Sequence, residues 1–296
     1  MMKRTIDPLV SIGASDRLHY ATGELLGADD FRDEQTYHRR QLARALLHLY
    51  GSGVVAGLRV THRHRPGQNG VPDEVSLEVA PGLAVDHAGR VVEVPRKACL
   101  RLRRWFTFLA AQDPQGELPD VGDLRAAWRA IGAGPAGIVI ADVFLAFHEC
   151  PRGYTPAFAS GPFDALDASQ PSRVRDAYEL SLVLRPEADA ALPSAADPWV
   201  AISGGTPAER RAAAVAIADS IWRQAAEPAA ENPAGIDPTA VLLARLRIPA
   251  VQGADADAAP SPDWSAATWA DEQGHLDHDV RRVLLPAAAL ARVLMP

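Results

Sequence analysis

The chain has 296 residues, of which 48% are hydrophobic, and a formal net charge of −7. This composition is that of a folded globular protein and excludes a mainly disordered chain. The acidic balance and the lack of a long basic run argue against nucleic acid and anionic membrane surfaces as partners. Two cysteines are too few for a disulfide framework. The N-terminus lacks a sustained apolar run, so we expect a cytoplasmic protein without a signal peptide.

Residues 29–50 are predicted to form a helix that ends before Gly51. One stripe of this helix is apolar and recurs at helical spacing: Phe31, His38, Leu42, Ala45, Leu46 and Leu49. We expect its three leucines to pack on strands at 54–60 and 75–79, because neither element can bury its apolar face alone. The opposite face is polar and predicts a solvated surface or a docking surface for an acidic neighbour. Its arginines are Arg32, Arg39, Arg40 and Arg44.

Beyond this helix, apolar residues alternate with period two at residues 54–60, 75–79 and 177–184, and residues 137–149 are rich in β-branched and aromatic residues. Both patterns indicate strands. The strands are predicted at residues 54–60, 75–79, 83–86, 91–94, 137–149, 177–184 and 240–248. A short helix is expected within 124–134 and a long loop at 150–171. A second helix is predicted at about 206–227, with Thr206 and Glu209 in a capping box.

The order of these elements predicts an α+β protein that is mainly β. We expect the N-terminal helix to pack on antiparallel hairpins, with helical insertions later in the chain. A helix and β-hairpin module is predicted at residues 1–103, followed by a linker at 104–135. A second β-rich module at 136–296 contains the helix at about 206–227 and ends in an apolar tail.

The stretch "VAPGLAVDHAGRVVEV" at residues 79–94 places Asp86 beside His87. Both residue types are common in catalysis, but a reaction centre also needs a third group and a pocket. Asp86 suits the first position of a turn, and Gly89 suits a position with positive φ. We therefore interpret the stretch as a structural hairpin.

Three groups of histidines are candidate metal ligands. His62 and His64 would share one face of a strand, but flanking arginines favour a solvated hairpin end. His148 and Cys150 in "FHECP" supply only two ligands. The third group is more typical of the polar start of a strand than of a divalent-cation site. Its members are His275, Asp277, His278 and Asp279.

The chain contains no phosphate-binding loop, nucleophile elbow, zinc-protease helix or C-x-x-C pair. We therefore expect no catalytic, cofactor or metal residues and a protein that is not an enzyme. A metal-dependent enzyme using His148 and Cys150 stays an alternative. A carbohydrate- or receptor-binding module is another, since tryptophans near loops can stack on sugars, although buried anchors are the favoured interpretation. These tryptophans are Trp199, Trp264 and Trp269.

Four separated segments carry a resemblance to a known family. The first, "YATGELLGADDFRDEQTYHRRQLARALLHLYGSGVVAGLRV", resembles the opening module of structural proteins encoded beside contractile, phage-tail-like particles. The matching residues are Tyr20, Gly23, Asp30, Phe31, Glu34, Gln35, Tyr37, Gly53, Val54, Val55, Gly57, Leu58 and Val60. The second, "VAPGLAVDHAGRVVEVP", is similar to a hairpin of baseplate and tail-fibre proteins. It matches at Pro81, Gly82, Ala84, Asp86, Gly89 and Arg90. "PSRVRDAYELSLV", and "AVLLARLRI" with "DHDVRR" downstream, look like further elements of the same proteins.

This resemblance implies a role as a building block of a baseplate, spike or fibre attachment. It implies partners among the other particle subunits and a homo-oligomer within the assembly. It carries no catalytic residues and no cofactor.

Overall fold

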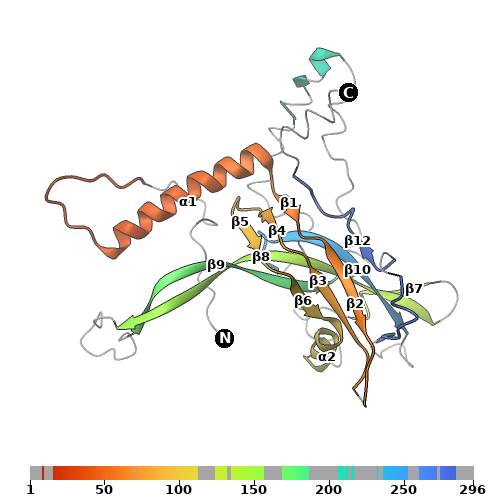
Figure 1. The fold of residues 1–296 in the computed structure, drawn as a ribbon. Helices are drawn as coiled ribbons and strands as arrows, with labels where there is room; N and C mark the ends of the chain where they lie inside the picture. Colours follow the sequence, from red (N-terminus) through yellow and green to blue (C-terminus); the bar gives the residue numbers. More distant parts are fainter. Residues whose placement is uncertain are drawn as a thin grey trace.

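The computed structural model describes most of the chain. The described residues are 9, 16–69, 71–112, 124–131, 135–156, 169–186, 206–209, 211–212, 215–216, 232, 236–252, 260–271 and 274–284. They form antiparallel sheets together with the helices α1 (Ala28–Tyr50) and α2 (Leu102–Gln112) (Figure 1). This confirms the predicted α+β class with mainly β structure.

Two three-stranded sheets follow α1 in the chain. In the first sheet the strand order is β1–β4–β5, and in the second it is β2–β3–β6. All neighbouring strands are antiparallel. The predicted strands are therefore present, with β1 and β2 formed on either side of the short segment at 58–59. The strands are β1 (Gly53–Gly57), β2 (Val60–Arg65), β3 (Glu74–Val79), β4 (Gly82–Val85), β5 (Val91–Val94) and β6 (Ala98–Arg101).

The third sheet contains the longest strands, and its main order is β11–β10–β8–β7, with β12 on β10 and β9 on β8. Two predictions are wrong here. Residues 128–130 form a strand in place of the expected helix, because they pair with β8. The expected loop at 150–171 is strand at both ends, since β8 and β9 continue their ladder as a long hairpin. The strands are β7 (Trp128–Ala130), β8 (Ala136–Pro156), β9 (Ser169–Leu184), β10 (Val241–Val251), β11 (Ser261–Pro262) and β12 (Leu276–Asp277).

One apolar core lies between the sheets and α2. Val60 and Leu77 from the first hundred residues belong to the same buried cluster as Val143 and Leu243. In α2, Phe106 joins this cluster. The two predicted modules thus share one core in the described residues.

The C-terminal end of the described residues lies beside β1. The Val54 amide donates to the Arg282 carbonyl at 2.8 Å, and the Leu284 amide donates to the Val54 carbonyl at 2.8 Å. Val54 and Val283 form a parallel bridge. Residues 282–284 therefore complete the edge of the β1 sheet.

The predicted faces of α1 are wrong for most of the apolar stripe, although Leu46 is half-buried and Arg32 and Arg44 are exposed as expected. The helix has the expected bounds, but Leu42 and Leu49 are 60% and 73% exposed, and Ala43 is its buried residue. Ala43 lies against Gly89 of the β4–β5 turn, where the close approach requires a small residue. Arg39, expected on the outer face, donates to the Glu149 carboxylate of β8 at 2.9 Å. The side of α1 that carries Arg39 and Ala43 thus faces the sheets, because an ion pair and a close backbone contact hold it there.

Some predictions concern residues at the edge of the description or outside it. The capping box is confirmed, because the Thr206 amide donates to the Glu209 carboxylate at 2.6 Å and the Glu209 amide donates to the Thr206 hydroxyl at 3.4 Å. Most of the predicted helix at 206–227 and the tail at 285–296 lie outside the described residues. Among the described helices, none has the length and apolarity that crossing a membrane requires.

Candidate functional site

The Asp86–His87 pair belongs to a structural hairpin, as expected. Asp86 is fully buried at the turn between β4 and β5. Its carboxylate accepts hydrogen bonds from the amides of Ala88 and Arg90 at 2.9 and 2.8 Å and from Arg90 Nε at 2.7 Å. Arg90 also donates to the Thr239 hydroxyl at 2.7 Å. Burial raises the pKa of the Asp86 carboxyl, and the charge and hydrogen bonds of Arg90 oppose that effect. All these partners position the turn.

His62 and His64 are not the solvated hairpin end that the sequence predicts. His62 is buried and its Nε2 is 3.0 Å from the Asp271 carbonyl. His64 Nε2 lies 3.1 Å from the Asp73 carboxylate and 3.2 Å from the Trp264 carbonyl. The C-terminal loop covers β2 and buries both rings, a contact between segments two hundred residues apart that local composition does not reveal.

The other histidines also make structural contacts. His275 Nε2 donates to the Thr268 carbonyl at 2.9 Å, and His278 Nε2 donates to the Val60 carbonyl at 2.9 Å. His148 and Cys150 lie on β8 beside Glu149, whose carboxylate is paired with Arg39. Among the described residues, no group of three or more His, Cys, Asp or Glu side chains is placed to hold a metal ion.

Two of the three tryptophans lie within the described residues and are core anchors. Trp269 is 2% exposed and Trp264 packs against the same apolar core. Their rings stack with centroids 6.2 Å apart, and the Trp269 Nε1 donates to the Asp263 carbonyl at 2.7 Å. The favoured interpretation as buried anchors is confirmed for Trp269. Trp199 lies outside the described residues.

Acidification is expected to destabilise the protein through His278. Desolvation lowers the pKa of this histidine below its ordinary value of 6.5, and unfolding restores that value. The unfolded chain therefore binds the proton more readily than the folded chain. As a result, the free energy of unfolding falls as the pH drops below about 6.5. Urea titrations at several pH values should show a shallower pH dependence in His278→Gln, whereas His19→Gln, at an exposed position, keeps the wild-type slope.

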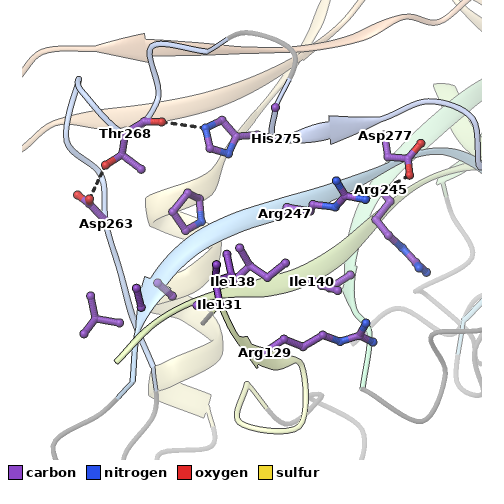
Figure 2. Close-up of a pocket in the computed structure, with 16 residues that line it drawn as sticks. Arg129, Ile131, Ile138, Ile140, Arg245, Arg247, Asp263, Thr268, His275 and Asp277 are labelled. Carbon is purple, nitrogen blue, oxygen red and sulfur yellow. Dashed lines mark hydrogen bonds and ion pairs between the residues drawn. The ribbon is translucent and has the colours of Figure 1, made fainter. Parts of the chain in front are cut away.

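A cleft of about 820 Å³ lies on the face of the third sheet that is turned away from the main core (Figure 2). Its floor follows from strand register, because residues two apart on a strand point to the same side. Across β7, β8 and β10, Arg129 is opposite Ile138 and Ile138 is opposite Pro249. At the next pair of residues on the same face of β8 and β10, Ile140 is opposite Arg247. The rim is formed by the loop after β11 and by Asp277 of β12. The rim residues of the loop are Asp263, Thr268, Gly274 and His275.

A buried charge cluster closes one end of this cleft. Asp142 is fully buried on β8, directly opposite Arg245 on β10. Arg245 donates from Nε to Asp142 Oδ1 at 2.8 Å and from Nη2 to Asp142 Oδ2 at 3.0 Å. Arg185, which follows β9, also donates from Nε to Asp142 Oδ2. One carboxylate thus serves two buried guanidiniums, and this group is called the Asp142 triad below.

The remaining charges of the cleft are partly paired. Arg247 Nη2 is 3.6 Å from Asp277 Oδ2. Hydrogen bonds from Thr268 and Ser265 lower the pKa of the Asp263 carboxyl, so that it is ionised at neutral pH. Arg129 differs, because its Nε and Nη2 are shielded from solvent and find no acceptor among the described residues. The described residues of the cleft therefore leave these two nitrogen atoms of Arg129 without an acceptor.

Sequence reasoning missed this cleft. Arg129 lay in a segment expected to be helical, and Asp142 lay inside a strongly apolar strand. One signal was available: a lone aspartate at the centre of "GIVIADVFLAFHE" is an unusual residue for a buried strand and requires a partner. The chain matches no protein-family model, and its sequence is not significantly similar to that of any curated protein.

Proposed function

We propose that this chain is a structural, non-enzymatic subunit at the baseplate end of a contractile, phage-tail-like particle and that it contacts its neighbours through α1. The observation that carries the proposal is an exposed stripe along α1 with the spacing of a helix-pairing surface. The resemblance of residues 20–60 and 79–95 to phage-structural proteins supports the same role.

The exposed stripe, called the α1 seam, follows a heptad rhythm. Its members are separated alternately by four and three residues, as are the a and d positions of paired helices. All six are exposed: Phe31, Gln35, His38, Leu42, Ala45 and Leu49. An apolar stripe of this kind normally packs against another element. A helix of a neighbouring subunit has the matching geometry.

The long β8–β9 hairpin is a second projection toward possible neighbours. Its outer part, residues 151–156 and 169–176, is exposed throughout, and it leaves the sheets on the same side as α1 (Figure 1). Two-stranded hairpins are marginally stable alone in water. The Arg39–Glu149 ion pair joins the hairpin to α1 at 2.9 Å. These two projections form a broad surface for an assembly and offer Tyr154 and Val174 as exposed apolar groups.

A particle-incorporation assay tests the proposal. The double variant Leu42→Glu, Leu49→Glu is expected to keep the wild-type melting temperature, because both side chains are already mostly exposed. It is also expected to be absent from purified particles, since two carboxylates in an apolar helix interface cost several kcal/mol, roughly 2–4. Particles from cells that express each variant are purified and their subunits are identified by mass spectrometry.

The matched control is Arg44→Glu, which places a carboxylate on an exposed position of α1 outside the seam. This variant should be incorporated like the wild type. Absence of the wild-type chain from intact particles, or normal incorporation of the double variant, would show that the proposal is wrong.

A further inference from the structure

The Arg129 guanidinium in the cleft of the third sheet has two donors without an acceptor among the described residues. Its Nε and Nη2 are buried and have no acceptor among the described residues. A buried donor without an acceptor is destabilising, and few are left so in folded proteins. The position is fixed by β7, whose Arg129 stands opposite Ile138. Folding thus places these two donors in a shielded site without supplying an acceptor from the described residues.

The neighbouring Asp142 triad shows which ligand the paired Nε and Nη2 donors of an arginine, called the fork below, bind. Arg245 uses the same two atoms, Nε and Nη2, to hold both oxygens of the Asp142 carboxylate at 2.8 and 3.0 Å. These two N–H groups point in parallel and match the two oxygens of a planar carboxylate. Arg129 presents the same pair of donors, and the cleft contains no carboxylate that reaches them among the described residues.

The carboxylates of the cleft argue against a second negative charge on the ligand. Asp263 and Asp277 line the cleft together with Arg129. A second negative charge on a ligand bound at Arg129 would lie in the same cleft as these two carboxylates, which repel it.

The walls of the cleft indicate the rest of the ligand. Apolar side chains beside Arg129 belong to Ile131, Ile138, Pro249 and Val251. Figure 2 shows Arg129 with Ile131, Ile138 and Ile140 among the labelled residues that line the cleft. A volume of about 820 Å³ is in the range of small-molecule sites. We propose that this cleft binds a monocarboxylate attached to an apolar group, with the carboxylate held by Arg129 and the apolar group on these side chains.

Two sources can supply that chemistry, and the same experiment separates them. A free organic acid is represented by benzoate, and the C-terminal carboxylate of a peptide is represented by N-acetyl-leucine. Each is compared with its neutral amide, benzamide or N-acetyl-leucinamide, in calorimetric titrations of the full chain. We expect saturable binding of at least one acid, with a dissociation constant on the order of 1 mM, and at least tenfold weaker binding of its amide. The acid that binds more tightly identifies the source.

Variants at Arg129 show whether the fork is responsible. Arg129→Met should weaken binding of the acid at least tenfold, and Arg129→Lys, which keeps the charge but not the fork, should weaken it by less. Arg173→Met, on the exposed outer part of β9, should bind as the wild type does. Without ligand, Arg129→Met should melt at or above the wild-type temperature, because it removes two buried donors that lack an acceptor among the described residues.

Several results would overturn the inference. They are failure of both acids to bind saturably to the wild type, equal binding of acid and amide, or unchanged binding in Arg129→Met. If that variant does not fold, the comparison of acid with amide on the wild type and the Arg129→Lys titration still decide the question. The inference does not depend on the proposed particle role, since incorporation is tested at the α1 seam and binding at Arg129.

Discussion

Replacement of Asp142 by Asn is expected to lower the free energy of unfolding by about 3–5 kcal/mol. The carboxylate is fully buried and accepts hydrogen bonds from Arg185 and Arg245. A neutral amide removes the negative charge that both guanidiniums share, and its own NH₂ group faces donors. In a chain of this size the melting temperature should fall on the order of 10 °C, which calorimetry or urea unfolding would detect.

Two controls separate this effect from a general sensitivity to charge. Asp29→Asn breaks the exposed ion pair with Arg32 and should change stability by less than about 0.5 kcal/mol. The triple variant Asp142→Leu, Arg185→Met, Arg245→Met removes the whole triad and should recover much of the loss, because a buried ion group is often replaceable by apolar side chains. A wild-type melting temperature in Asp142→Asn would mean that the triad is solvated, contrary to its burial.

Replacement of Gly89 by Ala is expected to release α1 from the sheets and to cost about 2–4 kcal/mol. Gly89 has a φ of +82°, and an added Cβ would lie 2.0 Å from the Ala43 carbonyl oxygen. Ala43 is the residue through which α1 is buried. The helix must therefore move away from the β4–β5 turn. Hydrogen exchange should accelerate in α1 while the amides of β8 and β10 stay protected.

Gly23→Ala is the matched control for this variant. Gly23 has a similar φ of +90°, but nothing lies within 4 Å of its added Cβ. It should show only the backbone cost of about 1–2 kcal/mol and normal exchange in α1. Equal exchange of α1 amides in the two variants would mean that the contact with Ala43 does not hold the helix.

Local patterns in the sequence were sufficient to predict most of the elements. The alternation of apolar residues identified β3 and the second half of β9, and the turn residues of "DHAG" identified the β4–β5 hairpin. The bounds of α1 also agree with its sequence signals. Its orientation did not follow from its amphipathic pattern, because the apolar stripe is exposed and Ala43 faces the sheets. The pattern shows that the stripe needs a partner, but it does not show whether that partner belongs to the same chain.

The cleft depended on long-range pairing and so could not be predicted. Arg129 became part of a sheet because β7 pairs with β8, and Asp142 met Arg245 across more than a hundred residues of sequence. Neither contact leaves a spacing motif. A single aspartate in a buried strand indicates that a cation lies nearby. It does not identify which of the thirty lysines and arginines supplies the positive charge.

The bridge between Val54 and Val283 has a consequence for how this protein is made on the ribosome. The first sheet cannot be completed until a segment more than two hundred residues downstream has left the exit tunnel. At 5–20 residues per second, synthesis alone imposes a delay of roughly 10–50 s. During that interval the edge of β1 is open and the nascent chain is exposed to mispairing. We expect folding to be slow and largely post-translational, as it is for other proteins with high contact order.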